Sequence, residues 1–146
     1  VALGYLNICD VHLLVGLFGQ PNKVAYLAKF ERGVDTSGIL ALDYGSFKAI
    51  SIGAKDCSAE IRSTIQGDKG SLTILGPTNS LPKIQLTLNG QESVDISQTN
   101  LHHRMYDEFV AFERIIAEKD FVSSRQALDH SQAVMSVLDQ AIASLP

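Results

Sequence analysis

Apolar residues change their spacing twice along this chain, and each spacing predicts a different kind of element. Over residues 8–18 they recur every three or four positions, at Ile8, Val11, Val15 and Phe18. This spacing predicts a helix. Asn7 stands where an N-cap is expected, and Asp10 would favour the exposed amides of the first turn. Gly19, followed by Pro21, predicts the end of the helix.

From residue 22 to residue 97 the apolar positions alternate, which predicts short strands. The alternation runs through "KVAYLAKFE" (23–31), "CSAEIRSTIQ" (57–66), "PKIQLTLNG" (82–90) and "ESVDIS" (92–97). Turn signals separate about seven such strands, at Arg32-Gly33, Tyr44-Gly45-Ser46, Asp68-Lys69-Gly70 and Asn89-Gly90. Strands joined by such short turns pair antiparallel, with one face of the sheet covered.

After Gln98 the helical spacing returns. A first stripe is formed by Met105, Phe109, Phe112 and Ile116, and a second by Leu128, Val134, Met135, Leu138 and Ile142. Ser123 and Gln126 have the spacing of a capping box at the start of the second helix. The order of elements predicts an α+β fold, in which an open, predominantly antiparallel sheet carries helices on one face. At 146 residues the chain fits a single domain, residues 1–146.

Composition narrows the classes of partner. The net charge of −4 and the scattered Lys and Arg residues argue against nucleic acid, and no apolar run approaches the ~20 residues that span a bilayer. Two cysteines, Cys9 and Cys57, fit reduced thiols in a cytoplasmic protein better than a disulfide framework. Because the apolar pattern already runs at Val1, we expect the chain to be a fragment of a longer protein.

The opening stretch "GYLNICDVH" (4–12) concentrates polar side chains that have three interpretations. Cys9 and His12 share a side of the helix, but zinc needs three or four ligands and the adjacent His102 and His103 would diverge, so we expect no metal. A nucleophilic Cys9–His12 pair is the second interpretation, although Asp10 would disfavour the thiolate. The third is structural: a small buried thiol and a hydrogen-bonded histidine.

Two further segments carry residues that are suited to chemistry. Lys55 and Asp56, at a strand end, form either a solvated ion pair at a hairpin or a polar pair at the rim of a cleft. The glycine-rich "QGDKGSLTI" (66–74) predicts a hairpin, because no Gly-Lys-Ser/Thr opens a helix there. No Gly-x-Gly-x-x-Gly occurs, so we expect no bound cofactor in this chain itself.

Several segments carry a more specific likeness when they are taken in order. They are "VHLLVGLFGQP" (11–21), "GVDTSGILALDYGSFKAISIGAKD" (33–56), "IQGDKGSLTI" (65–74), "HHRMYDEFVAFERII" (102–116) and "DFVSSRQALDHSQAVMSVLDQA" (120–141). Together they resemble the C-terminal domain of the Gfo/Idh/MocA oxidoreductases, the family of glucose-fructose oxidoreductase and inositol dehydrogenase. The resemblance runs across nearly the whole chain.

The resemblance implies that two domains would have different roles in the whole protein. An N-terminal Rossmann domain, absent here, would bind NAD or NADP and supply a catalytic lysine. The present domain would cover the nicotinamide, build the pocket for a small-molecule substrate such as a sugar or polyol, and form a homodimer through its open sheet face. It would catalyse nothing alone.

Many family members carry Asp-x-x-x-His on the first helix of this domain. Counting back from "VGLFG" places Tyr5 at the Asp position and Cys9 at the His position. His12, one turn further on, is therefore the expected catalytic residue, and Tyr5, Asn7, Cys9 and Lys55 are the expected substrate-binding residues. The departures leave an alternative, a sugar-sensing relative that binds ligand in the same pocket without turning it over.

The alternation also predicts how the open face is used. Leu27 lies opposite the Tyr26 row, and Ile50 and Ile52 lie opposite Ala49, so several strands are apolar on both sides. One layer of helices covers only one face of a sheet. We therefore expect the other face to pair with a second copy of the chain.

Overall fold

The computed structural model describes residues 2–97, 102, 103 and 105–146, and the chain forms two compact units. The first unit combines Val1–Ser58 with Glu118–Pro146, and the second is Ala59–Ala117. Each unit contains its own antiparallel sheet. Helices and antiparallel strands together confirm the predicted α+β class.

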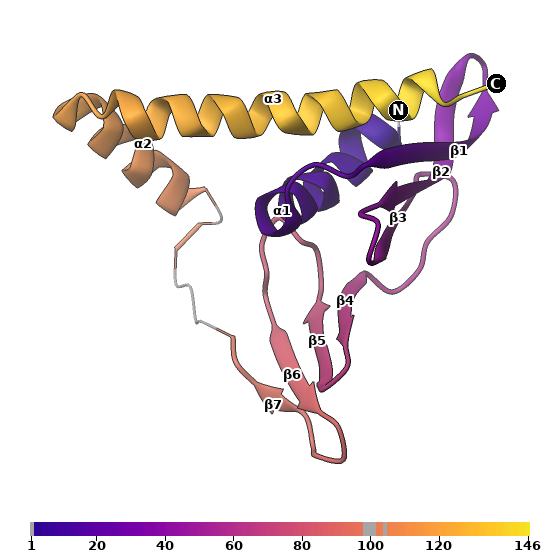
Figure 1. Cartoon of the computed structure of the whole chain (residues 1–146), viewed down its shortest axis with the longest axis horizontal. Coiled ribbons are helices and arrows are strands. Elements are labelled where there is room, and N and C mark those ends of the chain that lie inside the picture. The colour runs from indigo at the N-terminus through magenta and orange to yellow at the C-terminus, as the bar shows by residue number, and fades with distance from the viewer. Residues whose placement is uncertain (1, 98–101, 104) are drawn as a thin grey trace. The chain divides into compact units, whose positions relative to one another are not determined.

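The first unit is built from three helical segments and three strands. They are the π-helical turn η1 (Leu3–Asn7), helix α1 (Ile8–Phe18), strands β1 (Lys23–Glu31), β2 (Val34–Asp43) and β3 (Lys48–Ala54), and the long helix α3 (Phe121–Ala143) (Figure 1). The strands lie in the order β1-β2-β3, and α3 contacts both α1 and β1. A two-residue turn at Arg32 and Gly33, both with positive φ, joins β1 to β2 as the sequence predicts.

The core of this unit lies between the two helices and one face of the sheet. Its buried members come from η1, α1, β1, β2 and α3: Leu3, Val11, Val15, Tyr26, Leu40, Leu42, Val134, Val137, Leu138 and Ala141. Inward-facing Tyr26 is 2% exposed, whereas its neighbour Leu27 on the opposite side of β1 is 71% exposed. The predicted alternation of β1, with helices on one face of the sheet, is therefore confirmed in this unit.

Two predicted helix starts are wrong. Asn7 does not cap α1: its backbone is helical and continues from η1, and its buried amide donates to Ser51 on β3 (2.8 Å) in place of the helix amides. At α3 the N-cap is Asp120, whose carboxylate accepts from both the backbone N–H and the hydroxyl of Ser123. Ser123 thus acts as a donor to the cap, and the helix starts at Phe121, before the predicted capping box.

The second unit contains the other four strands and helix α2. The strands are β4 (Arg62–Gly67), β5 (Gly70–Leu75), β6 (Ile84–Leu88) and β7 (Val94–Asp95), in that order, and α2 is Tyr106–Glu118. Residues 57–61 were predicted to extend the first of these strands, but β4 begins only at Arg62. One further bond in the same register, from Gly76 N–H to Ile61 O (2.9 Å), precedes the turn at Gly76, whose φ is 112°.

The described residues contain seven strands, in agreement with the prediction of about seven, and these are divided between two sheets of three and four strands. The alternating pattern indicates which residues face inward along each strand, but it says nothing about which strand pairs with which. None of the helices in the described ranges is long and apolar enough to cross a membrane.

Candidate functional site

Predicted site residues fall into three groups on the first unit, and each group contacts a different part of the fold. The first group is Tyr5 on η1 with Lys55, which follows β3. The Lys55 ammonium lies 4.0 Å from the centre of the Tyr5 ring, a cation–π geometry. The backbone N–H of Lys55 donates to Thr36 O (2.9 Å), so the segment that carries the ammonium is tied to β2. Tyr5 is 66% exposed, which leaves the pair open to a ligand.

Asp56 does not pair with Lys55 as one of the two interpretations expected. Its carboxylate accepts from Lys29 Nζ (2.8 Å) and from the Thr36 hydroxyl (3.1 Å). The bond from Lys29, with the Thr36 bond and the Lys29 charge adding to it, holds the pKa of Asp56 below its usual value, although partial burial opposes the shift. Lys55 therefore keeps its charge directed to the Tyr5 ring.

The second group is a buried polar chain that joins α1 to β3. Asn7 is fully buried and donates to Ser51 Oγ (2.8 Å), and Ser51 in turn donates to the Asp10 carboxylate (2.5 Å). The Asn7 carbonyl Oδ1 is buried without a hydrogen-bond partner. Because Asn7 is enclosed by protein, its amide is placed to hold η1 and α1 against the sheet.

Glycine on β3 makes this enclosure possible. A Cβ added at Gly53 would lie 2.6 Å from Asn7 Oδ1, so no side chain fits there. Gly38, its partner on β2, is covered in the same way: a Cβ would lie 2.5 Å from the Tyr26 ring. Sequence reasoning missed Ser51 and Gly53. The available signal was the inward-facing row of β3, where small residues alternate with the large Ile50 and Ile52.

The third group joins α1 to α3. His12 Nδ1 lies 3.1 Å from His130 Nε2, and the two ring centres are 5.2 Å apart with an interplanar angle of 45°. Partial burial lowers the pKa of His12, and the positive charge that His130 can carry lowers it further. Sequence reasoning missed His130 because nothing along the chain indicates that position 130 meets position 12.

Cys9 is a half-buried free thiol three residues before His12, and Cys57 is free and exposed. No group of three or more His, Cys, Asp or Glu side chains within the described ranges could hold a metal ion. The structure brings together Tyr5 with Lys55, but it directs Asn7 into the sheet and His12 toward α3.

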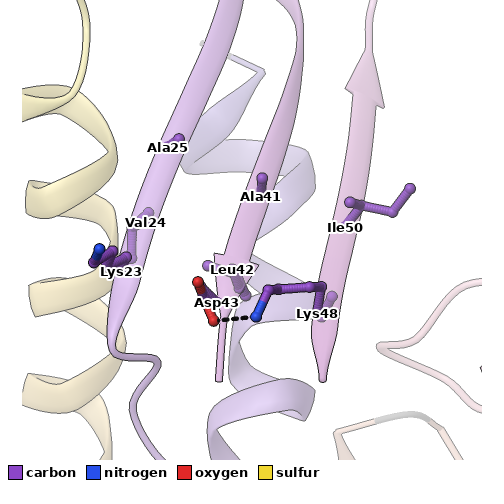
Figure 2. Close-up of a pocket in the computed structure, with 9 residues that line it drawn as sticks. Lys23, Val24, Ala25, Ala41, Leu42, Asp43, Lys48 and Ile50 are labelled. Atoms are coloured by element: carbon purple, nitrogen blue, oxygen red, sulfur yellow. Dashed lines mark hydrogen bonds and ion pairs between the residues drawn. The ribbon is translucent and has the colours of Figure 1, made fainter. Parts of the chain in front are cut away.

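A hollow of about 410 Å³ lies elsewhere, on the outward face of the three-stranded sheet (Figure 2). Its lining comes from all three strands: Lys23, Val24, Ala25, Ala41, Leu42, Asp43, Lys48, Ala49 and Ile50. The small side chains of Ala25 and Ala41 lie side by side across β1 and β2, with an ion pair between Lys48 and Asp43 at the strand ends. None of the predicted site residues lines this hollow.

Every described strand pair is antiparallel, whereas the doubly wound fold that binds dinucleotides is built from parallel strands with a glycine-rich turn into a helix. The chain also lacks the Gly-x-Gly-x-x-Gly turn.

The chain is similar to proteins named as oxidoreductases. It is 30% identical over 105 residues to "Uncharacterized oxidoreductase YgjR" of Escherichia coli (strain K12), an alignment that covers 71% of this chain and 32% of that protein. No family model matches the chain.

Solved structures show the same fold. The "putative oxidoreductase yvaA" from Bacillus subtilis matches 98% of this chain and 48% of its own, with a TM-score of 0.69 and 18% identity. A "putative oxidoreductase" from Klebsiella pneumoniae matches 95% of this chain and 45% of its own, with a TM-score of 0.66 and 18% identity. The chain therefore spans about a third of the curated relative and about half of each solved chain.

Proposed function

We propose that this chain is the substrate-binding and oligomerisation part of an NAD- or NADP-dependent oxidoreductase of the Gfo/Idh/MocA type. Its substrate would be a sugar, a polyol or a related hydroxyl or carbonyl compound. The observation that carries the proposal is the match to proteins named as oxidoreductases, which extends over nearly all of this chain but only a fraction of theirs.

The cofactor belongs to another part of the protein in this proposal. Two observations support this: the described sheets differ from the parallel sheet that binds dinucleotides, and the relatives have further length that this chain does not match. What this chain contributes is the substrate side of the site, on the surface of η1 and α1.

His12 is the proposed proton acceptor. A neutral imidazole takes the proton of a substrate hydroxyl most effectively when its pKa lies near the working pH, and the lowered pKa of His12 favours the neutral form. Tyr5, Cys9 and Lys55 would contact the substrate, with the Lys55 ammonium directed by the Tyr5 ring. Asn7 would support these residues from inside the fold, through its bond to Ser51 on β3.

The full-length protein tests the assignment in a spectrophotometric assay with NAD and NADP against a panel of polyols and sugars. Turnover is expected with at least one substrate, and His12→Ala should lower kcat/KM by about 100-fold or more. His103→Ala is the matched control, because His103 lies on the exposed segment before α2 and should leave the rate unchanged. A loss under about threefold in a folded His12→Ala protein would reduce His12 to a packing role.

A sugar-sensing relative is the second candidate. Tyr5 and Cys9 replace the residues that perform proton transfer in many members of the resembled family, and Asn7 is committed to the sheet. This candidate predicts that a sugar or polyol shifts the melting temperature of the full-length protein without reducing either nucleotide. Turnover at ordinary enzymatic rates would exclude it.

A homodimer through the three-stranded sheet completes the proposal. Its outward face exposes four large aliphatic side chains in two neighbouring rows: Leu27 (71%), Ile39 (41%), Ile50 (67%) and Ile52 (67%). The hollow over Ala25 and Ala41 offers space for a side chain of a second copy. A stable pairing would bury on the order of 1,600 Å² in total.

Sedimentation of the chain at micromolar concentration tests the pairing. We expect a dimer, and Ile50→Asp should convert it to a monomer because a carboxylate would be buried in an apolar interface. Ile61→Asp provides a control of the same residue type and similar exposure (64%) outside this sheet. A wild-type chain that sediments as a monomer would contradict the proposal.

A further inference from the structure

His130 has no part in the function proposed above, yet it makes the closest described contact to the proposed base. The two histidines approach from different helices, with His12 Nδ1 and His130 Nε2 3.1 Å apart. At this distance the two nitrogens share one proton, because two N–H groups cannot point at each other. One ring must donate and the other must accept.

The surface of α1 beside Gly16 accommodates the His130 ring. Gly16 lies one turn after His12 on α1, and a Cβ at Gly16 would be 3.7 Å from His130 Cε1. His130 is half-buried beside Gly16, while His12 is exposed. The ring with less freedom is therefore His130, and the ring that reaches solvent, and hence a ligand, is His12.

We propose that His130 is a positioning residue for His12: its Nε2 accepts the Nδ1 proton of His12, which leaves Nε2 of His12 as the nitrogen with the free lone pair. This inference rests on the proposed function for the role of His12 as base. When His12 takes a substrate proton at Nε2, the Nδ1–H bond to His130 persists and becomes charge-assisted. His12 therefore keeps its orientation when it becomes protonated.

Titratable groups precede both histidines in the sequence. On α1 these are Cys9 and Asp10, and the Asp10 carboxylate accepts from the Ser51 hydroxyl. On α3, Asp129 precedes His130 but forms an ion pair with Arg125 (3.1 Å). The lowered pKa of His12 has burial as its first cause and His130 as its second, which agrees with a pair that carries one positive charge more readily than two.

The test is a ¹H–¹⁵N NMR experiment on the labelled chain, which reports the protonation of each ring nitrogen. We expect His12 in the Nδ1–H tautomer, with a titration midpoint below the usual value for histidine. His130→Phe keeps a ring of similar size without an acceptor, and it should abolish the tautomer preference of His12.

His130→Gln restores an acceptor. Its side-chain oxygen can accept the Nδ1 proton, so it should restore the Nδ1–H tautomer of His12. If His12 keeps its native tautomer in folded His130→Phe, the inference is wrong. That result would leave the proposed function standing, since His12→Ala in the full-length protein tests the function separately.

Discussion

The contact between Asn7 and Gly53 can be tested by a single methyl group. Gly53→Ala would place a Cβ 2.6 Å from Asn7 Oδ1, 3.1 Å from Cγ and 3.2 Å from Nδ2. Asn7 cannot swing away, because it is fully buried and its amide is bonded to Ser51. The sheet and η1 must therefore separate, or the Asn7–Ser51 bond must break.

The expected cost follows from two opposing effects. Overpacking of this kind lowers the free energy of unfolding by about 1–3 kcal/mol. Gly53 has no positive φ, so alanine also restricts the unfolded chain and returns about 0.4–1 kcal/mol. We expect a net loss of roughly 1–2 kcal/mol, with the overpacking effect dominant because the neighbour is buried.

A double-mutant cycle measured by urea unfolding isolates the contact. In an Asn7→Ala background all three crowded atoms are gone, so Gly53→Ala should be neutral or slightly stabilising. Gly4→Ala is a matched control, since a Cβ at Gly4 has no atom within 4 Å. Equal costs for Gly53→Ala in the two backgrounds, within about 0.5 kcal/mol, would show that the contact does not exist.

Three further predictions concern the same unit. Asp120→Ala should lower the free energy of unfolding by about 1 kcal/mol because the bonds from Ser123 are lost, while Asp120→Asn should keep most of it; an equal loss for both would contradict the capping role. Burial, followed by the bond to Asp35, raises the pKa of Tyr26 to about 12. The native state then holds this proton more tightly than the unfolded chain, so stability should fall as pH rises from about 10 to 12, a slope that Tyr26→Phe removes in urea titrations. Gly38→Ala should destabilise the chain by about 1–3 kcal/mol because the Tyr26 ring lies over Gly38, and the cost should be smaller in a Tyr26→Ala background.

The spacing of apolar residues and the turn residues predicted most of the helices and strands of this chain from sequence alone. Helix α1, the alternation of β1 and the Arg32–Gly33 turn were predictable because each depends on residues near one another in the sequence. The first residues of the helices were less predictable. The Asn7 amide could satisfy either the helix amides or a distant partner, and only the tertiary structure brings Ser51 to it.

The candidate site shows the same division more sharply. Sequence identified Tyr5, His12 and Lys55 as residues with useful chemistry, but it could not pair them, because a helix stripe indicates a direction and no partner. Tyr5 meets Lys55 across 50 positions, and His12 meets His130 across 118. Such contacts depend on how α1 lies against α3 and β3, which is decided by packing of the Val11, Leu40 and Val137 core. The sequence therefore showed which side chains have useful chemistry. Which of them lie close together, and hence how they are protonated and whether a ligand can reach them, was decided only by the tertiary structure.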